Sequence, residues 1–342
     1  MFANFFPYKK AEPFLANEFE FTKKHATSIT VCTLYGKAED SLLKNSDSVV
    51  LLHPILDAAG NKMELFLKGK FNLAPFGFHL KELFSKALFF SPKKFYWFYI
   101  SALITRIALS SEAFKEVIKK IENSKEPVLY FYWGDNLAWT IPYLKRKIKN
   151  KNLKIVLRLH GSDLYENVKA NYAPLREDIF SAVDLIVPIS ENGKSYLAEK
   201  YPDFKNKLFS SRLGVFDSGL NPLPQGNTYH LISVSNMVAL KRIHLIFEAL
   251  QKTTLKIVWH HFGDGPLANE LKELIKTKRN DLEIEFHGHV SNQAIIDFYK
   301  KQPLNLFLNV SSTEGLPVSI MEALSFGVPV AATNVGGTSE LV

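Results

Sequence analysis

The sequence predicts an α/β protein that contains two doubly wound parallel sheets, one in each half of the chain. Three observations lead to this prediction. The chain has 342 residues, more than one hydrophobic core usually serves, so two domains are expected. Short apolar, β-branched runs recur along it, and most are apolar at consecutive positions, as in parallel strands that helices cover on both faces. Helical patterns fill the gaps, which gives the strand–helix alternation of this fold class.

Each half of the chain carries one set of strand candidates. Those of the first half are residues 28–34, 48–53, 127–133, 153–159 and 184–189. Those of the second half are residues 230–235, 255–262, 282–287, 304–310 and 328–333. Each set therefore supplies the strands of one sheet.

Helices are predicted between the strands, with the clearest pattern over residues 112–121. Apolar side chains recur there at the spacing of one helix face. They are Ala113, Phe114, Val117, Ile118 and Ile121. Residues 267–276 and 292–300 show a similar pattern.

A stretch rich in glycine and proline, residues 214–226, separates the two periodic regions. We therefore expect an N-terminal domain over residues 1–217 and a C-terminal domain over residues 218–342. Both domains are expected to be cut short. Only Met1 to Phe6 precede the loop around Pro7 where a first strand is needed, and the chain stops at Val342, soon after its last strand candidate.

Charge is divided unevenly between the two predicted domains. Residues 1–217 carry 32 Lys and Arg against 23 Asp and Glu, a net charge of +9, whereas residues 218–342 carry 10 against 11, a net charge of −1. This difference indicates either an anionic partner of the first domain, such as a membrane surface or nucleic acid, or a solvated lysine-rich surface. A nucleic-acid binder is disfavoured because the basic charge is not joined to a recognisable nucleic-acid module.

The composition is that of a soluble globular protein, with 46% hydrophobic and 22% charged residues. The single cysteine, Cys32, lies in an apolar run and is expected to be a buried structural thiol. One cysteine allows no disulfide within the chain, which fits a reducing cytosol. Residues 1–7 lack the features of a signal peptide, and the uncharged stretch 95–105 is shorter than the roughly 20 residues of a membrane span.

Two glutamates near the C-terminus are the strongest functional candidates. Glu314 follows a buried strand, and Glu322 lies on the helix expected between Pro317 and Gly327. Ligands of open α/β sheets bind beyond the carboxyl ends of the strands, which places Glu314 at a ligand crevice. The N-terminus of the following helix suits a diphosphate, and carboxylates accept hydrogen bonds from sugar hydroxyls well. Two glutamates eight positions apart would be weak evidence by themselves.

The surrounding pattern makes the case stronger. Glu314-Gly-Leu-Pro, Glu322-Ala, Gly327-Val-Pro-Val, Thr333-Asn-Val-Gly-Gly and Glu340 follow one another in this order. This series closely resembles the signature of the retaining family-four glycosyltransferases, which have the GT-B fold. The resemblance extends over nearly the whole chain and is firmest over residues 153–342. It implies two Rossmann-like domains that face a cleft.

Residues 233–242 resemble the phosphate-binding turn of that family, with Lys241 at the lysine position. Family members often carry an arginine five residues earlier, where this chain has Asn236. Arg242 is expected to supply the second positive charge. Cations at a helix start oppose the helix dipole, so a bound anion would account for their position there.

Two further loops resemble donor-binding segments of the family. Residues 262–266 match a Gly-Asp-Gly-Pro turn, in which Gly263 lets the chain approach a ligand and Asp264 has a turn or capping role. Residues 286–290 match the loop that holds the nucleotide base through its backbone; structural roles are favoured for His287 and His289 over donor contacts. No Cys, His and carboxylate residues lie at metal-ligand spacing, so a site without metal is expected.

In the first half, residues 158–163 end a buried strand and resemble the His-Gly-x-Asp segment of many relatives. His160 is expected beside the donor sugar, where it orients the sugar without acting as a nucleophile. Arg158 is expected to pair with Asp163 or to face phosphate.

Two other N-terminal segments stand out. The loop at residues 7–14 lacks the two glycines that many relatives carry there and resembles a branch of bacterial polysaccharide glycosyltransferases, with the roles of Lys9 and Lys10 open. Residues 81–106 combine aromatic residues with lysines. This composition favours either a segment that lies on an anionic membrane or a helix that packs on the sheet with a basic edge.

The resemblance implies transfer of a hexose-type sugar, with retention, from a UDP- or GDP-linked donor to a glycan or lipid-linked acceptor in surface polysaccharide synthesis. No cofactor is expected, and Lys241 and Arg242 would stabilise the leaving diphosphate. Glu314, His160 and Lys241 form the expected catalytic set. The expected donor contacts are Arg242, Glu322, Gly263, Gly315, Leu316, His287 and Gly288, with further contacts possible at Asp163, Arg158 and Asn236.

Glu314 would hold the donor sugar and Glu322 the ribose. The expected location is the cytoplasm, or the inner face of the cytoplasmic membrane. Two alternatives stay open: a nucleotide-sugar 2-epimerase on the same fold, and an inactive, truncated nucleotide-sugar-binding protein.

Overall fold

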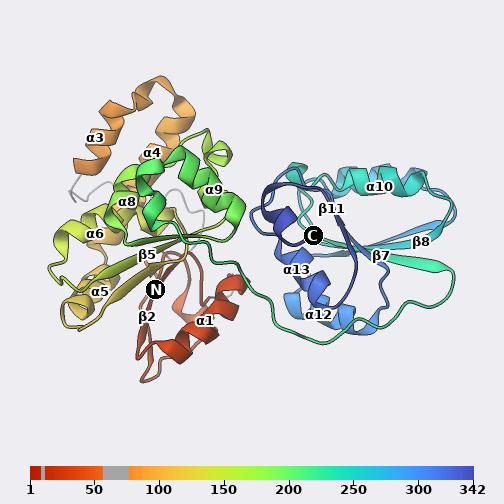
Figure 1. Ribbon diagram of the computed structural model, residues 1–342, viewed down its shortest axis with the longest axis horizontal. Coiled ribbons are helices and arrows are strands. Elements are labelled where there is room, and N and C mark those ends of the chain that lie inside the picture. The colour runs from red at the N-terminus through yellow and green to blue at the C-terminus, as the bar shows by residue number, and fades with distance from the viewer. Residues whose placement is uncertain (9–11, 57–76) are drawn as a thin grey trace. The chain divides into compact units, whose positions relative to one another are not determined.

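The computed structural model describes residues 1–8, 12–56 and 77–342, and Lys9 and Lys10 lie outside this part of the chain (Figure 1). The chain divides into two compact units, Met1–Arg212 and Leu213–Val342. Each unit has its own sheet and its own hydrophobic core, and each is described separately below.

The described residues of the N-terminal unit form a six-stranded sheet in which all pairs are parallel. Its strand order is β3-β2-β1-β4-β5-β6, so the direction of winding reverses between β1 and β4. The short strand β1 lies in the segment before Pro7 where a first strand was needed. The strands are β1 (Phe2–Ala3), β2 (Ile29–Thr33), β3 (Val49–Leu51), β4 (Val128–Phe131), β5 (Lys154–Leu159) and β6 (Leu185–Pro188).

Helices of this unit pack on the sheet through apolar faces, and α5 (Glu112–Glu122) shows how the sequence specifies them. Ser111 caps its N-terminus by accepting a hydrogen bond from the Phe114 N–H. Ala113, Phe114, Val117 and Ile121 are buried, as the spacing predicted. The other helices are α1 (Pro13–His25), α3 (Gly77–Ser85), α4 (Pro92–Ser110), α6 (Ile141–Lys147), α7 (Gly161–Leu164), α8 (Arg176–Ala182) and α9 (Glu191–Lys200). Short 3-10 helices occupy Ala38–Asp40, Leu88–Phe90, Asn136–Thr140, Glu166–Lys169 and Pro202–Lys207.

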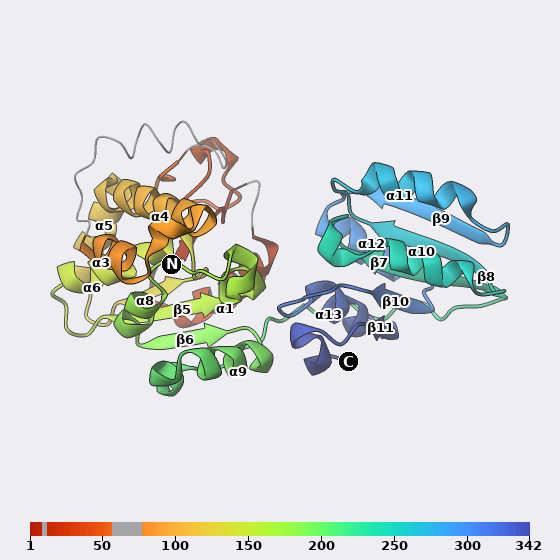
Figure 2. The ribbon, with the colours of Figure 1, turned by 90° about the horizontal axis from the view of Figure 1, so that it is seen from above.

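The C-terminal unit has a five-stranded parallel sheet with the order β11-β10-β7-β8-β9, so its winding reverses between β7 and β10. Helix α10 lies on one face of the sheet and α12 on the other (Figure 1), and α10 and α11 run along the same face (Figure 2). The strands are β7 (Thr228–Val234), β8 (Lys256–Phe262), β9 (Leu282–Gly288), β10 (Leu306–Asn309) and β11 (Val330–Ala332). The helices are α10 (His244–Gln251), α11 (Ala268–Leu274), α12 (Asn292–Lys301) and α13 (Val318–Ser325), with 3-10 helices at Ala239–Lys241, Ile275–Thr277 and Gly336–Glu340.

The predicted α/β class with two doubly wound sheets is confirmed, and every predicted strand overlaps an observed one. Differences are confined to the ends of elements. The α-helix expected over residues 267–276 ends at Leu274 and continues as a 3-10 turn. Pro317 is the N-cap of α13, one position before its first turn, and Gly327 ends that helix with a φ of +73°.

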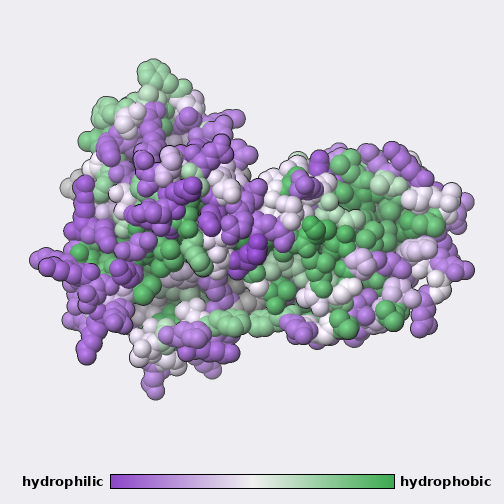
Figure 3. All heavy atoms as spheres, in the orientation of Figure 1, coloured by the Kyte–Doolittle hydropathy of each residue, from purple (hydrophilic) through white to green (hydrophobic). Residues whose placement is uncertain are grey.

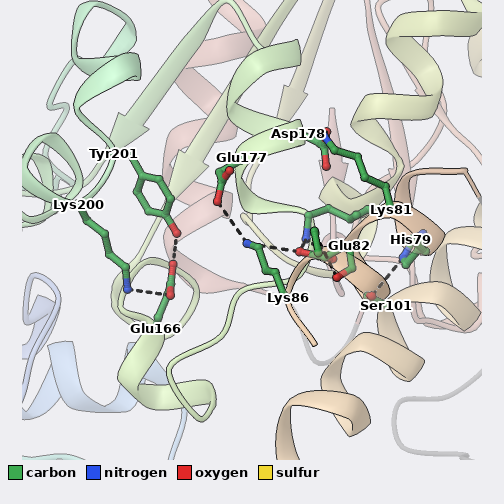
Figure 4. Close-up of polar contacts among 12 residues, drawn as sticks. His79, Lys81, Glu82, Lys86, Ser101, Glu166, Glu177, Asp178, Lys200 and Tyr201 are labelled. Atoms are coloured by element: carbon green, nitrogen blue, oxygen red, sulfur yellow. Dashed lines mark hydrogen bonds and ion pairs between the residues drawn. The ribbon is translucent and has the colours of Figure 1, made fainter. Parts of the chain in front are cut away.

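Helix α3 is fixed to the start of α8 by the buried carboxylate of Glu82. Both of its oxygens accept a hydrogen bond from the Leu175 N–H, at 2.9 and 3.0 Å. On the surface, Lys86 pairs with Glu177 at 3.3 Å and Lys81 with Asp178 at 3.2 Å (Figure 4). Burial raises the pKa of Glu82. The aromatic segment that follows α3 is thus anchored at its base. None of the helices in the described ranges has the length and apolar character that crossing a membrane requires.

Because His79 is buried, we expect the folded protein to lose stability in mild acid. Its Nδ1 lies 2.8 Å from the Tyr143 hydroxyl and its Nε2 lies 3.1 Å from the Ser101 hydroxyl (Figure 4). Burial, assisted by the charge of Arg106, lowers the pKa of His79 from 6.5 to about 3. The unfolded chain therefore binds a proton that the folded chain does not as the pH falls below about 6.5, and stability falls with it.

We expect this single group to lower the free energy of unfolding by up to about 2 kcal/mol between pH 7 and pH 5. Urea unfolding of the native protein and of a His79→Gln variant at both pH values measures this contribution. Between pH 7 and pH 5, the free energy of unfolding of the variant should fall by less than that of the native protein. An equal loss in both proteins would contradict the assignment, and His25→Gln, at an exposed position of α1, serves as the control.

Candidate functional site

The loops after β7 and β10 meet at the point where the winding of the C-terminal sheet reverses. In doubly wound sheets this switch point, beyond the carboxyl ends of the strands, is where ligands bind. The loop after β7 carries Asn236, Lys241 and Arg242, and the loop after β10 carries Glu314. Four of the residues predicted from the sequence thus come to one end of one sheet.

Lys241 and Glu314 form an ion pair across the switch point. The Lys241 Nζ donates to the Glu314 Oε1 at 2.6 Å, and the Asn309 side chain donates to the same oxygen at 3.2 Å. The side chains are only 21% and 10% exposed, so both charges are sheltered from solvent. Glu314 is therefore held in one orientation by two donors on its Oε1, and its Oε2 has no protein partner among the described residues.

Arg242 also links the loops after β7 and β10, but it does so through hydrogen bonds to backbone carbonyls. Its Nε donates to the Val310 carbonyl at 2.7 Å and its Nη2 to the Ser311 carbonyl at 2.9 Å. The residue itself has a positive φ of +48°, which turns the chain after the 3-10 helix. Arg242 thus fixes the Glu314 loop as well as adding positive charge. Asn236, at the place of the family's arginine, is exposed.

Glycines let four loops of this unit approach each other closely. A Cβ on Gly263 would lie 1.9 Å from the Ser235 carbonyl oxygen, and one on Gly336 would lie 1.8 Å from the Glu314 carbonyl oxygen. The Gly337 N–H donates to the Gly315 carbonyl at 2.9 Å. Asp264 has the turn role that was expected, since its Oδ1 accepts from the Gly265 N–H at 2.7 Å. The loops after β7, β8, β10 and β11 therefore form one packed end of the sheet.

Glu322 lies on α13, on the helix that follows the Glu314 loop, as predicted. Its Oε1 accepts a hydrogen bond from the Asn292 side chain at 2.7 Å. Burial raises the pKa of Glu322. Leu316 is buried between Glu314 and α13, and Gly315 is half-buried.

The predicted base-binding loop is tied to a neighbouring turn through its backbone, and the side chain of His287 contacts other residues of the sheet. The Gly288 carbonyl accepts from the Gly263 N–H at 2.8 Å, which ties this loop to the turn after β8. The side chain of His287, however, faces His260 and Glu285 on the sheet, at 3.4 and 3.5 Å. The expectation of a site without metal stays a prediction, but ligand atoms of His260, Glu285 and His287 lie within 4.8 Å of one another and form a group that could hold an ion. Spacing along the sequence did not show it because two strands supply the ligands.

In the N-terminal unit, His160 follows β5 and is 5% exposed. Its ring packs against Tyr132 and Trp133, with centroid distances of 4.6 and 4.3 Å. Its Nε2 is buried without a hydrogen-bond partner among the described residues. The ring thus lies at the carboxyl ends of β4 and β5 in an aromatic setting.

Asp163 is a buried structural link between two loops of the same unit. Its two oxygens accept from the His160 N–H and the Gly134 N–H, each at 2.6 Å. Burial disfavours its charged form, but hydrogen bonds from His160 and Gly134 outweigh this and lower the pKa of Asp163. The expected pairing of Arg158 with Asp163 is wrong, because the Arg158 Nε lies 3.3 Å from the Glu18 Oε2 on α1. Arg158 extends from β5 toward α1, away from the Asp163 loop.

Glu12 is a site residue that sequence reasoning missed. Its carboxylate accepts hydrogen bonds from three successive N–H groups of the loop after β1 and from the Trp133 indole. The backbone donors are Asn4 at 3.1 Å, Phe5 at 3.1 Å and Phe6 at 2.8 Å. Such a row of N–H groups is an anion-binding site, and here the chain fills it with its own carboxylate. The only signal in the sequence was an acidic residue before Pro13.

Comparison with known proteins agrees with this geometry. Residues 221–342 match the family described as Glycosyl transferases group 1. The chain is 28% identical over 200 residues to WcaL of Escherichia coli K12, provisionally named a colanic acid biosynthesis glycosyltransferase; the match covers 55% of this chain and 49% of WcaL. The chain spans about half the length of the curated relatives it matches first.

Two solved structures share the fold over the whole of this chain. One is the apo form of the lipopolysaccharide outer core galactosyltransferase WaaB, with a TM-score of 0.65 at 13% identity, covering 100% of this chain and 82% of WaaB. The other is Anabaena Alr3699/HepE in complex with UDP and glucose, with a TM-score of 0.61 at 16% identity and the same coverage. At these identities the likeness shows the GT-B fold.

Proposed function

We propose that the protein transfers a hexose-type sugar, with retention, from a nucleotide-sugar donor bound at the Lys241–Glu314 pair. The match of residues 221–342 to the glycosyl transferases group 1 family supports this proposal. The acceptor is a glycan or a lipid-linked glycan of surface polysaccharide synthesis. The name of WcaL and that of WaaB support this acceptor class. The observation that carries the proposal is the sheltered ion pair at the switch point of the C-terminal sheet.

The diphosphate of the donor is assigned to the Lys241 side of the pair. Lys241 and Arg242 place two positive charges at the switch point, in a setting where solvent screens them little. Preorganised positive charge stabilises a leaving diphosphate as the bond to the sugar breaks. A donor would also replace part of the contact between Lys241 and Glu314, since its phosphate oxygens compete for the same ammonium group. This electrostatic role requires no metal ion.

The donor sugar is assigned to the Glu314 side. Its Oε1 is held by Lys241 and Asn309, so its Oε2 is free to accept hydroxyl hydrogen bonds from a sugar. Glu322, on the following helix, is assigned to the ribose of the nucleotide. In the solved structure of Anabaena HepE the bound molecules are UDP and glucose, which favours a UDP-linked donor; GDP remains the alternative.

The N-terminal unit is assigned to the acceptor. His160 is assigned to the donor sugar, where it orients the sugar and interacts with the charge that develops on it. Glu12 supports this division of roles. The backbone N–H groups after β1 would otherwise be the phosphate site of that sheet, and a carboxylate already fills them. The switch point of the C-terminal sheet carries the side chains of Lys241 and Arg242 instead.

A thermal-shift screen over UDP, GDP, ADP and their sugars tests the proposed function. At least one nucleoside diphosphate should raise the Tm saturably, because a ligand that binds only the folded state stabilises it. Release of the diphosphate in the presence of a bacterial lipid-linked glycan then shows transfer. Binding without transfer would favour the inactive binding protein, and release of a free epimerised sugar would favour the epimerase.

Membrane attachment through α3 and α4 is the second part of the proposal. Hydrophobic residues form a patch on the surface of the N-terminal unit at the end where α3 and α4 meet (Figure 3). Phe84, Phe89 and Phe90 are 68%, 58% and 89% exposed, far more than a soluble surface normally leaves such residues. At the start of α4, Lys93 is exposed and Lys94 is half-buried. Aromatic groups for the headgroup region and lysines for anionic lipid together suit an interface-lying segment.

We expect the protein to float with vesicles that contain anionic phospholipid and to remain unbound to neutral vesicles. A Phe89→Ser, Phe90→Ser double variant should bind anionic vesicles about tenfold or more weakly, because it loses the burial of two large apolar side chains. Phe209→Ser, a change at an equally exposed phenylalanine outside this segment, should bind as the native protein does. No binding of the native protein to anionic vesicles would remove the membrane role.

A further inference from the structure

Three ligand groups, one of them the expected donor contact His287, converge on the α12 face of the C-terminal sheet. The His260 Nδ1 lies 3.0 Å from the Glu285 Oε2 and 3.4 Å from the His287 Nε2. The remaining pair, His287 Nε2 and Glu285 Oε2, are 3.5 Å apart. The three atoms therefore form a nearly equilateral triangle.

The size of this triangle fits a tetrahedral metal ion. Zinc binds imidazole nitrogen and carboxylate oxygen at about 2.0–2.2 Å, which places two ligand atoms of a tetrahedron about 3.3–3.5 Å apart. Two imidazoles and a carboxylate are also a ligand set that selects Zn²⁺ and related transition ions over Mg²⁺ or Ca²⁺. Only small side-chain shifts are needed to place an ion between the three atoms.

Two neighbouring strands hold the ligands in place. His260 on β8 pairs directly with Glu285 on β9 in the sheet register, and His287 follows Glu285 by two positions, where the register of β9 against β8 shifts by one residue. Sites on strands keep their geometry better than sites on loops. The positions of the three groups are thus set by the sheet itself.

The surroundings complete the pattern of a metal site. The second ring nitrogen of His260, Nε2, lies 3.1 Å from the His230 Nδ1 on β7, the outer hydrogen bond that fixes the tautomer of a metal-binding histidine. The rings of Phe262 and Phe298 pack against His287 at 4.2 and 5.4 Å and form an apolar wall.

The site is open on one side. The side chain of His260 is 4% exposed, whereas those of Glu285 and His287 are 43% and 27% exposed. A fourth ligand, such as water, can therefore reach the ion from the solvent side of β9. An ion there would join the edge strand β9 to β8, next to the loop where the Gly263 N–H donates to the Gly288 carbonyl.

We propose that His260, Glu285 and His287 bind one divalent transition-metal ion of the Zn²⁺ class that fastens the edge strand β9 to the sheet. This ion is a structural one, separate from the Lys241–Glu314 pair, and the proposal is independent of the sugar-transfer reaction. Without an ion, the side chains of His260, Glu285 and His287 form hydrogen bonds with one another. A bound ion would take the place of the proton in these hydrogen bonds.

Metal titration of the full chain, stripped with a chelator and dialysed, tests this proposal. We expect Co²⁺ to bind with one ion per chain and to give the visible absorption of a tetrahedral complex with nitrogen and oxygen ligands, and Zn²⁺ to displace it. Zn²⁺ should also raise the Tm, and Mg²⁺ should not. Neither measurement depends on enzyme activity.

Glu285→Ala is the deciding variant, because its side chain is partly exposed and its removal leaves the core intact. It should keep the far-UV circular dichroism and the chelator-treated Tm of the native protein and should bind Zn²⁺ more than about tenfold more weakly, a loss found even for partners that only orient ligands. The control, Glu283→Ala, removes the same charge from an exposed position of β9 two residues before Glu285 and should bind as the native protein does. Absence of saturable binding, or equal affinity of native protein and Glu285→Ala, would overturn the proposal.

Discussion

Glu314→Gln is expected to lower kcat/KM for sugar transfer by about 10²–10³-fold while the protein stays folded. The change keeps the size of the side chain but removes the charge that Lys241 and Asn309 hold in place. A loss of this size is typical when one preorganised polar group of a charge-stabilising site is removed. Release of nucleoside diphosphate in the presence of acceptor measures it, with circular dichroism as the check on folding.

The matched control is Glu248→Gln, at an exposed glutamate on α10 of the same unit. It removes the same charge from the same unit and should leave transfer unchanged. Near-normal turnover of Glu314→Gln would contradict the role of Glu314 at the donor sugar. A loss in both variants would indicate an effect of net charge.

Gly336→Ala is expected to destabilise the C-terminal unit by about 2–4 kcal/mol and to reduce transfer strongly. Two physical causes combine here. The φ of +54° costs a residue with a side chain about 1 kcal/mol, and the new Cβ would lie 1.8 Å from the Glu314 carbonyl oxygen, so the backbone must move. Since Glu314 is the residue displaced, the site is disturbed together with the fold. Urea unfolding measures the first effect and diphosphate release the second.

Gly327→Ala separates these two causes. Gly327 also has a positive φ, +73°, but a Cβ there would meet only the Leu220 side chain, at an ordinary 3.5 Å. It should lose about 1 kcal/mol, the cost of the backbone conformation alone. Equal losses in the two variants would show that the contact between Gly336 and the Glu314 loop does not constrain the site.

The sequence predicted the parts of the structure that depend on local pattern. Consecutive apolar runs located the strands, and the loop and helix positions of Glu314 and Glu322 followed from the strand, Pro317 and Gly327 around them. The convergence of Lys241 with Glu314 was implied only by the family resemblance. No local pattern specifies that β7 and β10 become neighbours at the reversal of winding.

Contacts between residues far apart in the chain could not be predicted in this way. The carboxylate of Glu12 accepts a hydrogen bond from the distant Trp133 indole, and Arg158 pairs with Glu18 of α1, far from it in the sequence. The cluster of His260, Glu285 and His287 depends on the register of β8 against β9, which spacing along the sequence does not contain. The residue types indicated which side chains could carry charge or bind a ligand. The residues that each of them contacts depend on the tertiary structure.

The most direct test of the central claim is calorimetric binding of a nucleoside diphosphate and of the matching nucleoside to the native protein and to Lys241→Ala. The native protein should bind the diphosphate much more tightly than the nucleoside, because charge-assisted contacts at the switch point are made only to the phosphates. Lys241→Ala should lose about 10–100-fold in diphosphate affinity, or roughly 1.4–2.8 kcal/mol, and bind the nucleoside as before. Unchanged diphosphate binding in Lys241→Ala would contradict the placement of the donor at the Lys241–Glu314 pair.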